Sequence, residues 1–170
     1  MAKKNGLDQE VRRVIYKFIL QHPGLHLNEL SRKLDIPVST INYHLNCLKK
    51  IEALITKSEG RYVRYYVTKK IGSRDTTIIN LLRKDVPLRI VVFLLLYPDS
   101  SQIKIGRYLG RHSTTIAFHL EKLIGKDIVE HSPNGTEINY RVKSQEDIFQ
   151  ILLRYHESLL QDSVDNIAYA

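Results

Sequence analysis

The feature that most constrains this chain is an internal repeat with a fixed offset of 75 residues. Residues 13–67 align with residues 88–142 without a gap, and fourteen of these 55 positions are identical. Several identities are apolar residues at helical spacing, such as Ile41/Ile116, Leu45/Leu120 and Leu48/Leu123. A repeat of this length indicates one structural unit present twice, and 170 residues are enough for two small domains. We therefore predict two copies of one domain.

The first copy predicts a defined order of elements. Apolar residues recur at helical spacing in three segments, and β-branched and aromatic residues flank a turn at Gly60. Pro23 ends the first helical segment, because proline removes a backbone donor and disfavours helix in the residue before it. In chain order we expect helices over 7–21, 27–34 and about 38–51, then a hairpin of strands 53–57 and 62–68.

This order resembles the winged helix-turn-helix domain. Three segments carry the resemblance, namely Leu27–Leu34, Pro37–Leu45 and Leu48–Ile55. The chain is most similar to the ArsR/MarR-type regulators of bacteria and archaea, in which a Ser-Thr-φ-x-x-His-Leu-x-x-Leu run (φ apolar) forms the recognition helix. The resemblance is strong over 13–67 and weaker over 88–142. It implies a mainly α fold with small β-hairpin wings (α+β), with two winged helix-turn-helix domains in tandem plus a C-terminal helix.

The two copies differ in net charge. The chain carries a net charge of +8, and a basic protein of this kind often binds nucleic acid. Residues 1–70 hold 14 basic and 6 acidic residues, whereas residues 71–170 hold 12 of each. Asn42 and Asn46 of the third helix correspond to Ala117 and Glu121 in the second copy. Phosphate contacts supply most of the affinity for DNA, so we expect the first copy to bind DNA and the second to have lost this role or to be at best an accessory.

The resemblance also implies which residues of the first copy would contact DNA. The third helix would lie in the major groove, and the hairpin and the second helix would hold the flanking backbone. The expected contacts are Ser39, Thr40, Asn42, Tyr43 and Asn46 on the third helix, Lys49 and Lys50 at its end, Arg32 and Lys33 on the second helix, and Lys57, Arg61 and Arg64 on the hairpin.

Other chemistry is not expected. A single cysteine, Cys47, excludes an internal disulfide and a multi-cysteine metal site. His44 and His119 are interpreted as packed core residues, not as ligands. The sequence has no phosphate-binding glycine loop and no catalytic constellation, so we expect neither an enzyme nor a cofactor. The longest apolar run, Ile90–Tyr97, is too short to cross a bilayer, and we expect a cytoplasmic protein.

The expected domains are 1–70 (DNA-reading winged helix), 71–84 (linker helix), 85–143 (second winged helix) and 144–170 (C-terminal amphipathic helix and tail). The segment 88–97 is so apolar that we expect it to be buried on nearly all sides by another element or subunit. The C-terminal helix either folds back on its own domain or contributes with the second domain to a homodimer.

We predict a sequence-specific transcriptional regulator, archaeal in style, which binds promoter DNA and could contact a basal transcription factor. An alternative is a winged-helix interaction scaffold of the transcription or replication machinery that binds nucleic acid only non-specifically. Basic positions confined to one copy of the motif favour the regulator.

Overall fold

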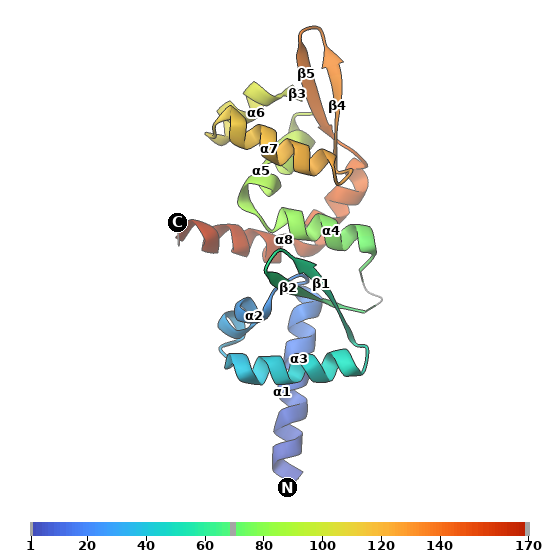
Figure 1. Ribbon diagram of the computed structural model, residues 1–170, viewed down its shortest axis with the longest axis vertical. Helices are drawn as coiled ribbons and strands as arrows, with labels where there is room; N and C mark the ends of the chain where they lie inside the picture. The colour runs from blue at the N-terminus through green and yellow to red at the C-terminus, as the bar shows by residue number, and fades with distance from the viewer. Residues whose placement is uncertain (1, 69–70, 169–170) are drawn as a thin grey trace. The chain divides into compact units, whose positions relative to one another are not determined.

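The computed structural model describes residues 2–68 and 71–168 (Figure 1). The chain divides into two compact units, Met1–Thr76 and Thr77–Ala170, which we call unit 1 and unit 2. Lys69 and Lys70, at the end of the first expected domain, and the last two residues of the expected tail lie outside the described residues.

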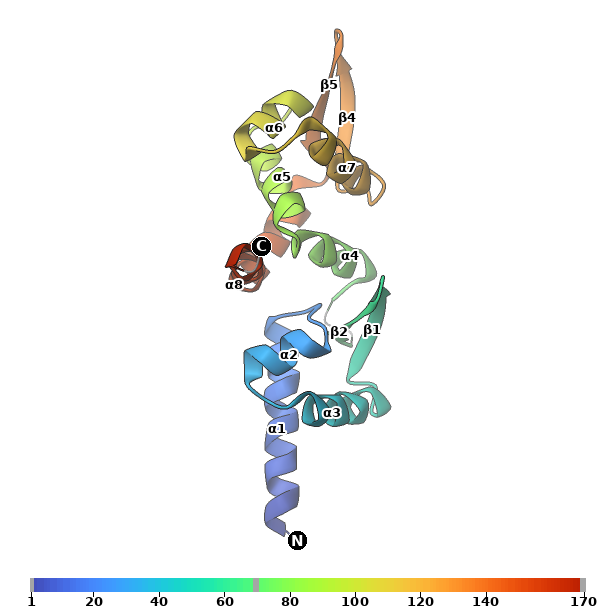
Figure 2. The same ribbon diagram turned by 60° about the vertical axis from the view of Figure 1, so that its left-hand side comes forward.

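Unit 1 contains three helices and a hairpin (Figures 1 and 2). In chain order these are α1 (Ala2–Gln21), α2 (Leu27–Leu34), α3 (Val38–Lys50), β1 (Leu54–Glu59) and β2 (Tyr62–Val67). The type of each element agrees with the sequence prediction, although α1 begins five residues earlier than expected. A capping box starts α2, in which the His26 backbone N–H donates to Glu29 Oε2 at 2.8 Å and the His26 side chain accepts from the Glu29 backbone.

The core of unit 1 lies where the three helices and the hairpin meet. Ile15 and Ile19 of α1, Leu30 of α2, and Ile41 and Leu45 of α3 have no exposed surface. Because buried residues on α3 recur every three to four positions, the opposite face of this helix points away from the core. The packing of α3 thus fixes which of its side chains solvent can reach.

Unit 2 repeats this order of elements. After α4 (Ser73–Leu82), which crosses the boundary between the units, come α5 (Asp85–Leu96), β3 (Ser100–Ser101), α6 (Gln102–Leu109), α7 (Ser113–Ile124), β4 (Val129–Asn134), β5 (Glu137–Val142) and α8 (Gln145–Ala168). The three strands form an antiparallel sheet in the order β3-β5-β4. In unit 1 an isolated bridge between His26 and Arg64 stands in place of the β3–β5 pairing.

The backbone supports the repeat independently of residue identity. Four positions with positive φ in unit 1 recur in unit 2 at the same offset of 75, as the pairs Gly24/Asp99, Asp35/Gly110, Glu52/Asp127 and Gly60/Gly135. This conformation is uncommon for residues other than glycine, so the shared positions mark the same turns in both units. The predicted fold class, a mainly α chain with β-hairpin wings, is confirmed.

One side of the apolar helix in unit 2 is not covered within that unit. The helix expected over 88–97 is α5, and its inner face is buried, but Val92 is 40% and Leu96 is 64% exposed. Within unit 2 the other elements cover only one side of α5, so the burial of its other side by another subunit stays a prediction. The C-terminal helix, α8, has a break at Tyr155. No helix in the described part of the chain is long and apolar enough to cross a membrane.

Candidate nucleic-acid interface

The outward face of α3 gathers most of the residues expected to contact DNA. Ser39, Asn42, Tyr43, Asn46, Lys49 and Lys50 are exposed, and Thr40 is half-buried. On the other side of the helix, Ile41, Leu45 and Leu48 are buried in the core of unit 1. We call the six exposed residues the α3 face.

The chemistry of the α3 face is polar and cationic. A side-chain amide can donate and accept at the same time, which matches the edge of adenine in the major groove. Asn42 and Asn46 lie one helical turn apart, so both amides point to the same side of α3. Lys49 and Lys50 place two cations in the last turn of the helix, where they can bind phosphates. This face therefore combines groups that can read bases with groups that can bind the backbone.

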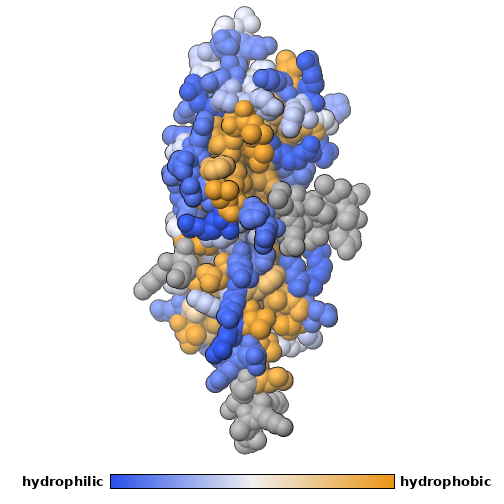
Figure 3. Space-filling view, turned by 180° about the vertical axis from the view of Figure 1, so that it is seen from behind, coloured by the Kyte–Doolittle hydropathy of each residue, from blue (hydrophilic) through white to orange (hydrophobic). Residues whose placement is uncertain are grey.

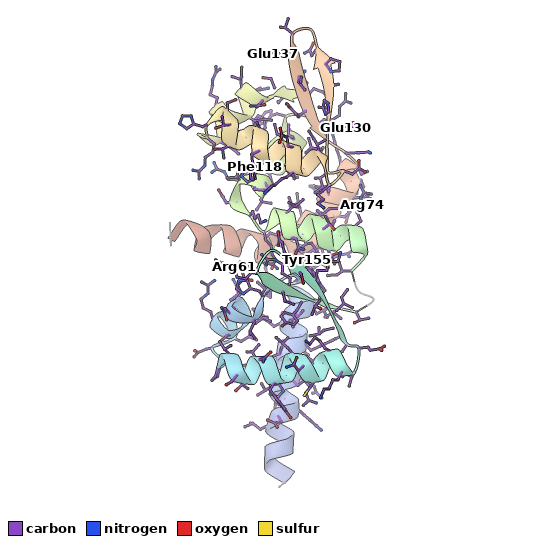
Figure 4. All side chains as sticks on the ribbon, in the orientation of Figure 1. Arg61, Arg74, Phe118, Glu130, Glu137 and Tyr155 are labelled. Atoms are coloured by element: carbon purple, nitrogen blue, oxygen red, sulfur yellow. The ribbon has the colours of Figure 1, made fainter. Side chains whose placement is uncertain are left out.

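The tip of the hairpin presents one more exposed cation. Arg61 occupies the two-residue turn between β1 and β2, next to Gly60 (Figure 4). Its guanidinium lies 5.0 Å from the centre of the Tyr62 ring, a cation–π contact that leaves the side chain exposed. Arg61 is therefore exposed at the tip of the hairpin, and its role as a contact to the DNA backbone stays a prediction.

Arg64 does not fit the role expected of it. Its side chain is buried, and its guanidinium donates hydrogen bonds to the Gly24 carbonyl and to Glu59 Oε2, both at 2.7 Å. A second carboxylate, that of Glu29, lies 3.6 Å away. The expectation failed because Arg64 lies where His26 bridges to β2, a pairing that the sequence did not reveal. Arg64 connects the hairpin to the start of α2.

Lys57 is also engaged within unit 1. It is half-buried on β1 and donates a hydrogen bond to Thr76 Oγ1 on α4. On α2, Arg32 is exposed and Lys33 is half-buried. The structure therefore brings the α3 face together as one surface and leaves Arg61 as the exposed cation of the hairpin, while Lys57 and Arg64 hold the hairpin in place.

His44 packs beside the α3 face without belonging to it. Its side chain is 1% exposed, its ring meets the ring of Tyr43 edge-on at 5.0 Å, and Nδ1 has no hydrogen-bond partner. Burial, with a smaller contribution from the nearby Arg12 cation, holds the pKa of His44 below its ordinary value. Cys47 is a half-buried free thiol. The described residues contain no cluster of His, Cys, Asp and Glu able to hold a metal ion.

The corresponding face of unit 2 has a different chemistry. On α7, Ala117 and Glu121 stand where α3 has Asn42 and Asn46. Phe118 is exposed in the place of Tyr43, and the Lys122 ammonium lies 3.9 Å from the centre of its ring (Figure 4). This helix presents fewer groups that could bind base edges or phosphates.

Three helices followed by a hairpin, with the second and third helices joined by a short turn, define a winged helix-turn-helix fold. Residues 9–77 match a family model described as "HTH_HVO_0163_N, N-terminal HTH domain". Unit 1 thus has the winged helix-turn-helix fold, and the family match extends from residue 9 to residue 77 in α4.

The sequence of one relative aligns with more of the chain. An uncharacterised HTH-type transcriptional regulator of Methanocaldococcus jannaschii is 31% identical over 163 residues, which is 92% of this chain and 39% of the relative. The chain therefore spans about two fifths of the length of that relative.

Solved structures are similar at lower identity. A homodimeric winged helix-turn-helix DNA-binding domain from Mycobacterium bovis, described as a possible ArsR-family regulator, is 19% identical with a TM-score of 0.42 and covers 55% of this chain and 82% of its own. The PcaV transcriptional regulator from Streptomyces coelicolor is 13% identical with a TM-score of 0.43 and covers 79% and 84%.

Proposed function

We propose that this protein is a transcriptional regulator that binds double-stranded DNA sequence-specifically at promoters through unit 1. The observation that carries the proposal is the α3 face, where amides, an aromatic ring and two lysines are exposed on the side of the helix opposite the buried Ile41, Leu45 and Leu48. The name of the Methanocaldococcus relative, an HTH-type transcriptional regulator, supports the same class.

In this proposal α3 lies in the major groove. A 13-residue helix is about 20 Å long, and the groove of B-DNA admits a helix. Ser39, Asn42 and Asn46 contact base edges, and the Tyr43 ring contacts a thymine methyl group. Lys49, Lys50 and Arg61 contact phosphates on either side, which gives affinity without sequence preference.

Unit 2 is proposed to support assembly. It leaves apolar side chains exposed on two helices, with Val92 and Leu96 one turn apart on α5, and Phe149 and Leu153 one turn apart on α8. Figure 3 shows an apolar patch on the face of this unit, in the upper half of the view. A second copy of the chain would cover these side chains, and a dimer would place two α3 faces on two half-sites.

Selection of bound sequences from a random pool of duplex DNA tests the proposal. We expect the full chain to enrich one motif, and expect Asn42→Ala to change the preferred bases. Glu121→Ala, at the matching position of α7, is the control and should enrich the same motif as the wild type. Salt-sensitive binding without any enriched motif would contradict the proposal and favour the interaction scaffold.

A further inference from the structure

Three side chains are stacked at the hairpin of unit 1. The rings of His26 and Tyr62 lie parallel, with their centres 4.5 Å apart and an angle of 10° between their planes. The Arg61 guanidinium lies 5.0 Å from the centre of the same Tyr62 ring. We call His26, Tyr62 and Arg61 the wing stack. Both rings are half-buried and Arg61 is exposed, so the stack connects the N-cap of α2 to the exposed cation of the hairpin.

The pairing of the strands explains why the two rings meet. His26 forms a bridge with Arg64 of β2, so these two side chains lie on one face of the sheet. Tyr62 is two positions before Arg64, and alternate residues of a strand point to the same face. Tyr62 is therefore a diagonal neighbour of His26, at a separation that an aromatic side chain can span.

Capping of α2 does not by itself account for a histidine at position 26. The His26 Nδ1 accepts from the Glu29 backbone N–H across 3.5 Å, which is a long and therefore weak hydrogen bond. Asn, Asp and Ser are the preferred residues at this position of a helix. What the imidazole offers in addition is a flat face, and Tyr62 covers that face. The ring of His26 thus makes a contact with the hairpin that a better cap would lack.

Two carboxylates connect the wing stack to the buried Arg64. Glu59 stands opposite Tyr62 across the hairpin and accepts from Arg64 Nε at 2.7 Å. Glu29 accepts from the His26 backbone N–H at 2.8 Å and lies 3.6 Å from Arg64 Nη1. Both rings of the wing stack therefore have neighbours that are themselves fixed.

The repeat shows that the wing stack belongs to unit 1. Unit 2 has none of the three groups at the matching positions, which are Ser101, Thr136 and Glu137. There the hairpin pairs with a third strand, β3, whereas in unit 1 the bridge at His26 stands in that place. The wing stack thus occurs in the unit proposed to bind DNA and is missing from the other.

We propose that His26 and Tyr62 are positioning residues, which hold the Arg61 guanidinium in place for a DNA phosphate. A long side chain loses conformational freedom when it binds, and a side chain that is already held loses less. In this proposal neither ring touches the DNA. The inference rests on the proposed function, in which Arg61 contacts the DNA backbone, and adds the two residues that prepare this contact.

The first measurement uses the full chain without DNA. A proton over the face of an aromatic ring has its NMR signal shifted upfield, so the δ protons of Arg61 report the wing stack directly. We expect an upfield shift in the wild type and its loss in Tyr62→Leu. His26→Asn keeps a cap for α2 but removes the ring, and should reduce the same shift. Wild-type shifts in both variants would overturn the proposal, whatever the result with DNA.

The second measurement is the affinity for random-sequence duplex DNA at several salt concentrations. Tyr62→Leu and His26→Asn should each weaken binding by about two- to tenfold, which is the cost of ordering one long side chain. The slope of log affinity against log salt should not change, because Arg61 still reaches the phosphate in the complex. Tyr62→Phe keeps the ring and should restore the affinity lost in Tyr62→Leu. Ser101→Asn, at the matching position of unit 2, is the control for His26→Asn and should bind like the wild type.

A double-mutant cycle separates positioning from general damage to the fold. In a chain that already carries Arg61→Ala, Tyr62→Leu should have no further effect, because the side chain that it positions is gone. Additive losses, or wild-type affinity in Tyr62→Leu, would overturn the proposal. A wild-type chain with no affinity for DNA is a different outcome, since it would contradict the proposed function and overturn this proposal with it.

Discussion

Arg61 and Arg64 lie three residues apart on one hairpin, yet their surroundings differ completely. Arg61 is exposed at the turn, whereas Arg64 is buried against the Gly24 carbonyl and the Glu59 carboxylate. A phosphate can reach only the first. A buried guanidinium whose donors are already bonded would have to break those hydrogen bonds before it could bind an external anion.

Arg61→Ala should weaken binding to all DNA sequences to a similar extent. Loss of one phosphate contact lowers the slope of log affinity against log salt by about 0.9. Affinities measured between 50 and 200 mM salt give this slope, and the thermal midpoint should not change because Arg61 is exposed. A slope equal to that of the wild type would show that the hairpin tip does not touch the DNA backbone.

Arg64→Ala should act through stability. Its removal takes away the guanidinium that donates to the buried Gly24 carbonyl, which costs about 1–3 kcal/mol. Urea unfolding of unit 1, followed by its amide signals, measures this loss. If Arg64→Ala keeps full stability and instead lowers the salt slope as Arg61→Ala does, the structural role assigned to Arg64 is wrong.

Asn42→Ala should change specificity more than affinity. An amide that binds a base edge contributes about 1–3 kcal/mol at the preferred site and little on random DNA. Competition between the selected site and random duplex measures both quantities. Equal loss on the two DNAs would assign Asn42 to the backbone.

At the scale of elements, α3 is held by an apolar stripe that includes one ionisable residue. His44 is buried with an unpartnered Nδ1, and burial keeps its pKa below the value in the unfolded chain. The unfolded chain therefore takes up this proton first as the pH falls. The stability that depends on neutral His44 is complete above the unfolded pKa of about 6.5 and is lost as the pH drops below it.

We therefore expect the free energy of unfolding of unit 1 to decrease between pH 7.5 and pH 5, and to decrease less in His44→Gln, which cannot be protonated. Urea unfolding at the two pH values, read from amide signals of unit 1, measures the difference. His119→Gln is the control, since it removes the equivalent histidine of unit 2 and should leave the pH dependence of unit 1 unchanged. The same pH dependence in His44→Gln as in the wild type would exclude His44 as the cause.

The elements and the α3 face could be predicted from the sequence because both follow from local patterns. Helical spacing of Ile41, Leu45 and Leu48 determines which side of α3 is buried, and the complementary residues must then be exposed. The burial of Arg64 could not be predicted, since it depends on a bridge to His26, 38 positions earlier, that has no local signal. The grouping of Phe93, Tyr97 and Tyr108 could not be predicted either, because contacts between α5 and α6 have no local signal in the sequence.

At the scale of the whole molecule, the two units have similar backbone folds but different net charges. The excess of +8 lies in residues 1–70, while residues 71–170 are neutral. Unit 2 nevertheless keeps Arg107 in the last turn of α6 and Arg111 in the turn before α7. A few phosphate contacts from this turn would add affinity to a chain already bound through unit 1.

Paired substitutions in the full chain separate the two contributions. Lys49→Gln with Lys50→Gln removes two cations from the α3 face, and Arg107→Gln with Arg111→Gln removes two cations from the end of α6 and the turn after it. If unit 1 alone binds DNA, the first pair lowers the salt slope by about 1.8 and the second pair leaves it unchanged. Both pairs remove the same charge from exposed positions, so a general effect of net charge would move them equally. Equal decreases in slope would mean that both units contact DNA, and the division of labour between them would be wrong.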